Sequence, residues 1–574
     1  MPSAFSYANA SDPVAGELVQ SVQQGRTVTG KIIDDTGEPL IGVSVLVKGT
    51  TVGTITDFDG NYSLEVPSGK HILVISYIGY KTQDITVGKS NQLNIKMEAD
   101  TQALDEVVVV GYGVMKKRDL TGSIASVKAA DIVKSPASNA MEALQGQVPG
   151  LDIVRNSGKA TSGVTINIRG QRSLSDVKDE FGNNVANAPL FIIDGMQGGD
   201  FSDIAPADIE SIEVLKDGAA AAIYGSRAAN GIVMITTKGG NKFEKSKPIV
   251  TVSHTSSVVS ISRKLDAMNA EQFRTAYKEA RANNNQVAEQ GWIVNPFHPY
   301  YNRTTDWQDV IFRTAYQTRN DVSVRGGSDS FSYGVSAGYR DLKPVVINTK
   351  YNQINLRANF LYKVGKRITA GTKVSFSNMD YTRILSSGSN NYSALRAALF
   401  TNPCFSPYDP LTGEVVDWLG VKEQRNPLAV ATKVPIHFKR RWLTMNQYIQ
   451  INLMKGLNLR VSVSGDISKT NQDSFMPKEF DSNTPARDNG KFRQSESQSF
   501  LNENTLSYNG KIKSHHLNVV LGQSFQQDRT EAIVLNGNGY IDKSVITIQN
   551  ASTYTNISRS ESERALLSFF GRVS

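Results

Sequence analysis

The segment Phe331–Tyr339, with the sequence FSYGVSAGY, alternates aromatic or aliphatic residues with serine or glycine throughout. The same period of two returns in Ile354–Phe360 (INLRANF) and in Leu457–Val463 (LNLRVSV). Because successive side chains of a β-strand point to opposite faces, each segment has one apolar and one polar face. Segments of about ten residues with this alternation are typical of a transmembrane β-barrel, in which one face meets lipid and the other meets water.

The connections between these strands differ in length on the two sides of the predicted sheet. Tight turns are expected near residues 326–329, 365–367, 455–456 and 509–511. Long connections are expected at about 264–317, 379–440, 468–498 and 526–563. Outer-membrane barrels are built in this way, with short periplasmic turns and long extracellular loops. We therefore predict about ten antiparallel strands in residues 241–574, the first of them near residues 249–260.

Residues 119–240, which precede these strands, have the pattern of a compact α+β domain. Runs of aliphatic and β-branched residues favour strands, and stretches of small or helix-forming residues favour helices. The expected strands are Val164–Gly170, Pro189–Gly195, Asp208–Leu215 and Gly231–Thr237, and the expected short helices are Asn139–Gln147 and Gly218–Tyr224.

Four motifs in this domain are long and specific: Ile168–Gly170 (IRG), Phe191–Gly195 (FIIDG), Ile209–Asp217 (IESIEVLKD) and Ala222–Gly231 (AIYGSRAANG). They resemble the plug domain of TonB-dependent outer-membrane transporters, specifically the SusC/RagA type of Bacteroidota. The resemblance assigns the plug-motif positions to Arg169, Gly170, Asp194, Gly195, Tyr224, Gly225, Arg227, Asn230 and Gly231. A plugged barrel of this class has ~22 strands. The resemblance therefore implies that residues 241–574 form the N-terminal part of such a barrel, in a protein about twice as long.

The linker at residues 99–118 contains a segment rich in valine, Leu104–Gly113 (LDEVVVVGYG). Four successive β-branched residues disfavour a helix and favour an extended chain, which can bind a partner by adding a strand to its sheet. Taken without its context, the segment favours an ordinary buried strand. The resemblance gives this segment the place of the TonB box, formed by Asp105, Glu106, Val107, Val108, Val109 and Val110.

Residues 27–98 have the pattern of a small β-sandwich, with several short strands separated by turns. This domain is similar to the carboxypeptidase-regulatory-like module found at the front of the same family. Asp57, Asp59 and Asn61 alternate as calcium ligands do in an EF-hand loop, but the closing glutamate and the flanking helices are missing. An Asp-Gly hairpin turn explains them better. Residues 1–26 are expected to be a signal-peptide remnant and linker, because Ala8–Ala10 has the small-x-small pattern of a cleavage site.

Composition and motifs exclude several other classes of protein. The 574 residues carry a net charge of +8 without a dense basic run, which argues against nucleic acid as a partner. A single cysteine, Cys404, excludes a disulfide framework and a multi-cysteine metal site. Gly334–Gly338 fits the GxSxG pattern of serine hydrolases, but it lies inside a predicted strand and not at the required strand-to-helix turn. We therefore expect no enzymatic activity, no cofactor and no metal site.

The sequence thus predicts a mainly β protein with an N-terminal β-sandwich, an α+β plug domain and an incomplete antiparallel transmembrane β-barrel. The resemblance implies TonB-dependent active import of a nutrient, an oligosaccharide or a peptide, across the cell outer membrane. The implied partners are the TonB–ExbB–ExbD energy-transducing complex, a SusD-like surface lipoprotein and outer-membrane lipid. Two alternatives remain open, an outer-membrane surface receptor or adhesin without transport, and a passive porin.

Aromatic residues in the long connections are candidates for stacking on a substrate. They include Trp292, Tyr300, Trp307 and Trp418. Packing within the loops, or contact with a lid, is the alternative explanation for the same residues.

Overall fold

The computed structural model describes residues 26–34, 37–50, 52–67, 72–77, 80, 82–88, 90–98, 107–110, 113–116, 124–134, 141–155, 164–171, 173, 175, 186–197, 201, 204, 206–217, 221–239, 243, 245–286, 302–384, 393–417, 419, 425–480, 487–512, 515–542 and 545–573. The chain divides into two compact units, one of residues 1–108 with 114–121 and one of residues 109–113 with 122–574. Each unit is described by itself.

The first unit contains a β-sandwich of two small sheets, with strand orders β4-β1-β7 and β3-β2-β5-β6. Its strands are β1 (Arg26–Ile33), β2 (Ser44–Val47), β3 (Gly53–Ile55), β4 (Asn61–Val66), β5 (Ile72–Ser76), β6 (Gln83–Thr86) and β7 (Ile95–Lys96). Alternate residues of these strands, such as Val28, Val45 and Ile75, fill the core between the sheets. The sandwich expected from the short, turn-bounded strands is therefore present.

The Asp57–Asn61 segment is a turn stabilised by its own aspartate. The Asp57 carboxylate accepts hydrogen bonds from the backbone N–H groups of Asn61 at 2.8 Å and Asp59 at 3.0 Å. These bonds, led by that from Asn61, hold the pKa of Asp57 below its ordinary value. Its carboxylate is thus engaged with the backbone of the turn. The predicted hairpin is wrong in one respect, because the turn joins β3 and β4, which belong to different sheets.

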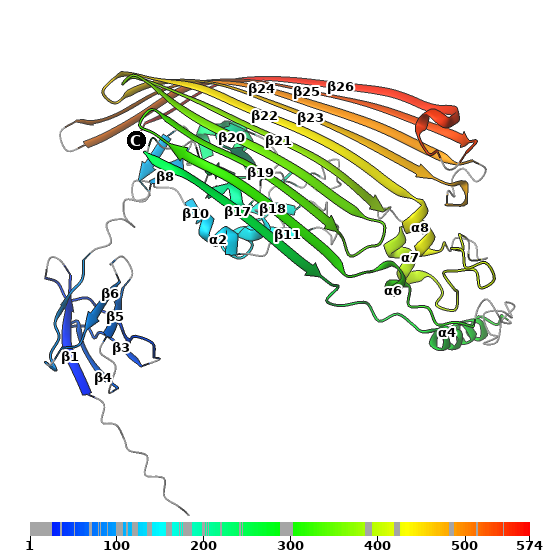
Figure 1. The fold of residues 1–574 in the computed structure, drawn as a ribbon, viewed down its shortest axis with the longest axis horizontal. Helices are drawn as coiled ribbons and strands as arrows, with labels where there is room; N and C mark the ends of the chain where they lie inside the picture. The colour runs from blue at the N-terminus through cyan, green and yellow to red at the C-terminus, as the bar shows by residue number, and fades with distance from the viewer. Residues whose placement is uncertain are drawn as a thin grey trace, which may run out of the picture. The chain divides into compact units, whose positions relative to one another are not determined.

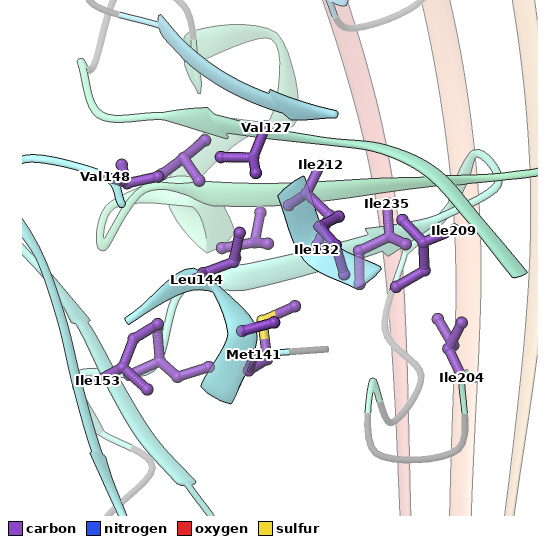
Figure 2. Close-up of a cluster of buried hydrophobic side chains, with 14 of the residues drawn as sticks. Val127, Ile132, Met141, Leu144, Val148, Ile153, Ile204, Ile209, Ile212 and Ile235 are labelled. Atoms are coloured by element: carbon purple, nitrogen blue, oxygen red, sulfur yellow. The ribbon is translucent and has the colours of Figure 1, made fainter. Parts of the chain in front are cut away.

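The second unit begins with an α+β domain, here called the plug domain, built on a five-stranded sheet with the order β10-β15-β16-β13-β14. Its strands are β10 (Ile124–Lys128), β13 (Leu190–Ile193), β14 (Met196–Gln197), β15 (Ile209–Leu215) and β16 (Ile232–Thr237), with β11 (Leu151–Arg155) and β12 (Val164–Ile168) as a separate hairpin. Three 3₁₀ segments, η2 (Glu142–Leu144), η4 (Pro206–Asp208) and η5 (Ala222–Ala228), and the helix α2 (Ala129–Lys134) complete it. Figure 2 shows its core, in which Ile132, Met141 and Leu144 meet Ile212 and Ile235 of the sheet.

Two predicted helices of the plug domain are wrong in extent. The stretch Asn139–Gln147 contains only the single turn η2 among its described residues. The predicted helix Gly218–Tyr224 is replaced by η5, which continues to Ala228 and contains Gly225 at φ 66° and ψ −154°. A left-handed glycine cannot continue a right-handed helix, so the small residues of this motif form a kinked turn.

The rest of the unit is one antiparallel sheet of ten strands in sequential order, which confirms the strand number expected from the alternation. The strands are β17 (Ser246–Val259), β18 (Ala315–Gly327), β19 (Phe331–Lys343), β20 (Lys350–Val364), β21 (Ile368–Ile384), β22 (Pro435–Met454), β23 (Leu457–Met476), β24 (Asn489–Ile512), β25 (His515–Tyr540) and β26 (Ala551–Val573). Within the described part of the chain, β17 and β26 are its edges, so the sheet is an open part of a barrel.

Directly opposed residues of a ladder lie on the same face of the sheet, so the register shows which side chains share a face. One continuous row runs across seven strands through Ser336, Arg357, Ser375, Thr444, Asp466, Ser499 and Asp528. This polar face, which we call the lumen face, is the one that the plug domain contacts. The opposite face carries apolar rows, one of which runs through Leu356, Phe376, Leu443 and Ile467.

Two of the predicted long connections, and one predicted turn, are wrong. β23 and β24 are joined by residues 477–488 and β25 and β26 by residues 541–550, because these strands continue far past the apolar segment. The ladder between β24 and β25 also continues through Asn509 to the pair Ile512↔His515, so the turn lies beyond residues 509–511. The apolar alternation ends where a strand leaves the membrane, because both faces of the sheet then meet water. The backbone ladder does not need an apolar face, so it stays paired beyond that point.

The other two long connections are present and contain helices. Residues 260–314 hold α4 (Ala270–Asn283) and α6 (Trp307–Ile311), and residues 385–434 hold α7 (Ala394–Phe400) and α8 (Pro427–Lys433). Figure 1 shows all four helices at one end of the strands, opposite the tight turns. In the part of the chain that the structure describes, none of the helices has the length and apolar character needed to cross a membrane.

A polypeptide limited to residues 1–574 is expected not to form a closed pore. Its strands β17 and β26 leave unpaired backbone groups at two edges, and each such group costs several kcal/mol in lipid. The measurement is electrophoretic mobility with and without heating in detergent, together with conductance in planar bilayers, beside a closed porin as control. A monodisperse, heat-resistant pore formed by this polypeptide would contradict the expectation.

Candidate functional site where the plug domain meets the barrel wall

The FIIDG motif ends in a two-residue turn that joins β13 to β14. Ile193 pairs with Met196 across this turn, and its two central residues, Asp194 and Gly195, have φ values of 54° and 88°. Positive φ at both positions is the type I′ hairpin, which favours Asp-Gly because these residues tolerate the left-handed region. The conformation of the motif is therefore dictated locally, and it places the Asp194 carboxylate at the end of the plug sheet.

Asp194 contacts both a neighbouring strand of its own domain and the barrel wall. Its carboxylate accepts hydrogen bonds from Thr237 of β16, from the backbone N–H at 3.1 Å and from the hydroxyl at 2.7 Å. It also forms ion pairs with Arg357 of β20 at 3.1 Å and with Lys373 of β21 at 2.9 Å. The exposed fractions of the three side chains are 7%, 10% and 18%, so the cluster is largely shielded from water. A small cavity beside it is lined by all three charged residues and by Trp442.

The two cations determine the charge state of this carboxylate. Burial alone raises the pKa of Asp194, but Lys373 and Arg357 outweigh it and hold the pKa below its ordinary value. Asp194 is therefore ionised at neutral pH and offsets two lumen-face cations. Removing its charge would leave both cations buried without a counter-ion. This change destabilises a protein more than replacing all the charged partners by apolar residues does.

A second contact joins the end of β16 and the segment before β15 to strands β19 and β20. Ser336 donates a hydrogen bond to Asp208 at 2.9 Å, and Asn359 donates to the Thr237 hydroxyl at 2.9 Å. Burial raises the pKa of Asp208, with Arg357 and Ser336 acting in the opposite direction. Beside these bonds a Cβ built on Gly334 would lie 2.8 Å from the Cα of Gly239, so two backbones meet there.

This contact explains the GxSxG pattern noted in the sequence. Gly334 and Ser336 lie in the middle of β19 and face the plug domain. The glycine permits close approach of the plug backbone, and the serine supplies a hydrogen bond to it. Both are thus docking residues, and they lie inside a strand as predicted from the sequence.

A third contact involves the AIYGSRAANG motif and strands β24 to β26. Arg227 donates a hydrogen bond to the side-chain oxygen of Gln526, and Gln197 donates to Glu503 at 2.7 Å. Tyr224 is buried beside them, and burial together with Glu503 raises the pKa of its hydroxyl. The lumen face therefore holds the plug domain at three separate places along the sheet.

The remaining plug-motif residues stabilise the plug domain itself. Arg169, at φ 57°, forms an ion pair with Asp217 at 2.5 Å, and Gly170 follows it at φ 85°. Asn230 donates to the backbone carbonyls of residues 186 and 188 at 3.0 and 3.3 Å. A Cβ on Gly231, at φ 88°, would lie 2.8 Å from Ile168, so this position requires glycine. The structure thus divides the predicted motif into residues that contact the wall and residues that shape the domain.

The TonB-box segment is only partly described. Asp105 and Glu106 lie outside the described residues, whereas Val107–Val110 forms β8, which pairs with β9 (Gly113–Lys116) in a two-stranded sheet. Within the described chain, no strand occupies the second edge of β8. The extended conformation and the open edge are those that strand addition needs. The assignment of a TonB box stays a prediction.

Three of the four loop aromatics, Trp292, Tyr300 and Trp418, lie outside the described residues. Trp307 begins α6 and is only 2% exposed, and its indole N–H donates to the backbone carbonyl of Asn402 at 3.1 Å. This burial favours packing within the helical cluster over stacking on a ligand. No group of three or more His, Cys, Asp or Glu residues suited to a metal is found among the described residues.

Several site residues were missed by the sequence reasoning. Arg357, Lys373 and Glu503 are single charged residues at polar positions of otherwise uncharged alternating segments, and this isolation was the available signal. A row of aromatic rings on the lumen face was also missed. Tyr381 stacks on Phe438 at 4.9 Å and lies 6.0 Å from Tyr351 between ring centroids. Arg383 covers two of these rings, at 5.2 Å from Tyr381 and 5.0 Å from Phe438.

Comparison with known proteins supports both domain types. Residues 28–109 match the CarboxypepD_reg-like domain, and residues 116–232 match the TonB-dependent Receptor Plug Domain. TonB-dependent receptor P3 of Formosa agariphila is 31% identical over 565 residues, which are 96% of this chain and 53% of that protein. TonB-dependent receptor SusC of Bacteroides thetaiotaomicron is 39% identical over 350 residues, which are 59% of this chain and 32% of that protein.

The fold is similar to that of a solved importer. The RagAB peptide importer in its open-open state superposes with a TM-score of 0.70 at 26% identity, over 82% of this chain and 54% of that one. The chain thus spans about half the length of the relatives that it matches over most of its own length.

Asp194→Asn is expected to loosen the plug domain from the wall. The change keeps the shape of the side chain but leaves Arg357 and Lys373 without their counter-ion, at a cost of ~3 kcal/mol. The measurement is hydrogen exchange at β13 and β14 as a function of urea, in the membrane receptor. Asp309→Asn is the control, because Asp309, which is 65% exposed, pairs with Lys264 at a site where solvent screens the charges and the ion pair contributes little to stability. Equal effects of the two changes would contradict the assignment.

The same contact is expected to depend on pH in one direction. The folded-state pKa of Asp194 lies below its ordinary value of 3.8, so its stabilisation is complete above that value and is lost as the pH falls through the folded-state pKa. Acid should therefore release the plug domain of the wild type, and Asp194→Asn should flatten this dependence. Identical acid titrations of exchange at β13 and β14 would show that another group is responsible.

Proposed function

Because the chain belongs to the SusC/RagA type of TonB-dependent outer-membrane receptors, we propose that it acts in energised import of a nutrient. In this proposal the plug domain closes the lumen, and force from the inner-membrane TonB–ExbB–ExbD complex opens it. The role is transport without catalysis. The alternatives of a passive porin and of a receptor without transport are outcomes of the test below.

The observation that supports the proposal best is the triple attachment of the plug domain to the lumen face. The Asp194 cluster, the Ser336–Asp208 contact and the Arg227–Gln526 contact all connect the domain to different strands. A domain held in this way blocks diffusion through the lumen. Since the periplasm contains no ATP, the energy that moves it has to arrive mechanically from the inner membrane.

The chain order suggests how a pull would reach the plug domain. Val107–Val110 of β8 precedes β10, which among the described residues is an edge strand of the plug sheet and pairs with β15 alone. An edge strand can be removed without breaking any other pairing, and β10 is held by five residue pairs, from Ile124↔Leu215 to Lys128↔Ser211. In our proposal, TonB pairs with the TonB-box segment as an added strand, and tension then separates β10 from β15 before the rest of the sheet.

The proposed cargo is an oligosaccharide or a peptide, delivered with the help of a SusD-like surface lipoprotein. Two similarities support this class: one relative is named SusC, and one structural neighbour is the RagAB peptide importer. The stacked rings of Tyr351, Tyr381 and Phe438 do not add to this support, because Tyr351 and Tyr381 are only 5% and 1% exposed and Arg383 covers the rings of Tyr381 and Phe438. They pack against one another on the lumen face, on strands β20, β21 and β22.

At least one of the variants Val107→Pro and Val108→Pro is expected to abolish uptake while the receptor stays in the outer membrane at its normal level. Proline removes a backbone N–H that an added strand needs, and two adjacent positions are tested because successive N–H groups point to opposite edges. The measurement is uptake of labelled oligosaccharides and peptides by cells that carry the receptor. Val108→Ala is the matched control, since it keeps the N–H group, and it should transport normally.

The outcomes separate the alternatives. Uptake that persists in both proline variants would reject energised import through this segment and favour a porin. Ligand binding to wild-type cells without any uptake would favour a receptor without transport.

A further inference from the structure

The outward face of the ten-stranded sheet has a clear apolar band. On β22, outward positions from Leu443 to Leu453 are mostly apolar, and several of their side chains are exposed. These ten residue steps span ~33 Å along a strand, or ~25 Å along the membrane normal at a strand tilt of ~40°. That height matches the hydrocarbon band of an outer-membrane barrel, so Leu443 marks one border of the band.

This border lies on the extracellular side. The strand continues from Leu443 toward Pro435, where the long connection with α7 and α8 is attached, and the tight turn at Lys455–Gly456 lies at its other end. Long connections face the cell exterior in outer-membrane barrels. Arg441, one outward position beyond Leu443, is therefore at the level of the headgroups of the outer leaflet.

Arg441 faces another cation at this level. It is directly opposite Lys469 of β23, and Lys439 is the next outward residue along β22. Like charges that face each other across a ladder are destabilising. Among the described residues, neither Arg441 nor Lys439 has an acidic group within ion-pair distance, and Lys469 has only Glu496 at 3.9 Å. Asp380, which is opposite Lys439, pairs with Lys350 at 3.3 Å.

Two other outward cations of the same sheet, on β25 and β26, are neutralised within the protein. Arg529 of β25 pairs with Glu561 at 2.8 Å, and Arg559 of β26 pairs with Glu531 at 2.8 Å. The basic group on β22 and β23 differs from these two cations in having more positive groups than ion-paired carboxylates, and Asp473 of β23 interacts with Lys439 only beyond ion-pair distance. It also borders exposed hydrocarbon, since Leu443 and Ile467, themselves directly opposed, are 43% and 48% exposed.

We propose that Arg441, Lys469 and Lys439 bind the phosphate of a phosphorylated glycolipid in the outer leaflet. Guanidinium and ammonium groups supply charge-assisted hydrogen bonds to phosphate oxygens, and a phosphate relieves the repulsion between the facing cations. The acyl chains then lie on Leu443 and Ile467. This adjacency selects a lipid over free phosphate, because inorganic phosphate satisfies the cations but leaves the apolar surface uncovered.

The test uses the intact receptor in mild detergent with diphosphorylated lipid A as the probe, and native mass spectrometry counts the bound lipid. The double variant Arg441→Gln, Lys469→Gln is expected to bind the probe roughly tenfold or more weakly, since two charge-assisted contacts are lost. Arg529→Gln, whose charge is neutralised in the protein, is the matched control and should bind as the wild type does. Lys469→Arg keeps the charge and should retain binding.

Each comparison bears on the proposal. Unchanged binding by the double variant, or an equal loss in Arg529→Gln, would overturn the site. Wild-type binding of dephosphorylated lipid A as tightly as of the diphosphorylated form would show that charge is not recognised. Displacement of the lipid by millimolar inorganic phosphate would show that the hydrocarbon contributes nothing, which contradicts a lipid as the occupant. Normal heat-dependent mobility of every variant establishes that the barrel is folded in each case.

Discussion

One constraint determines the face to which each side chain of the sheet points. It is the requirement that backbone N–H and C=O groups be paired where water is absent. A strand in hydrocarbon must give each N–H and C=O a partner in a neighbouring strand, and the resulting ladder leaves no freedom in the direction of the side chains. A shift by one residue would turn Arg357 to lipid and Leu356 to the lumen, and it would do the same along the whole strand. The docking of the plug domain depends on this register, because all the wall residues that contact it are at the alternate strand positions that face the lumen.

The contact between plug and wall is suited to being broken and remade. Its contacts are ion pairs, side-chain hydrogen bonds and one glycine-to-glycine approach, at Asp194, Ser336, Arg227 and Gly334. In a wet lumen, water replaces a broken hydrogen bond, so the net cost is only about 1 kcal/mol for each. An apolar contact of the same size would resist separation through its whole buried area. These polar contacts therefore hold the domain because there are many of them. A force applied in one direction can break them one after another.

The sequence predicted those features that follow from local rules. The period of two in Ile354–Phe360 indicated the faces of β20, and the aliphatic run Phe191–Ile193 indicated β13. The partners of Asp194 were not predicted, because Arg357 and Lys373 are 163 and 179 residues away in the chain and only the tertiary fold brings them together. The ends of β23 to β26 were misjudged for a different reason. Beyond the membrane both faces meet water, so the side chains no longer report whether the ladder continues.

Strand β22 shows how parity and height together assign roles along a single chain segment. Trp442 and Thr444 face the lumen, where both bind Asp466 of the neighbouring strand. Leu443, between them, faces lipid, and Arg441 has the same parity but lies one step higher, at headgroup level. The environment of a side chain on β22 thus depends on two things, the face to which it points and its distance along the strand from the tight turn at Lys455–Gly456. An arginine in the middle of the band, near Ile449, would meet hydrocarbon and cost ~2–4 kcal/mol, whereas at the border the same charge can meet a phosphate. The two-residue alternation that gives the wall its apolar outer face therefore also positions two sets of charges. One set holds the plug domain on the lumen face, and the other contacts the membrane on the outward face.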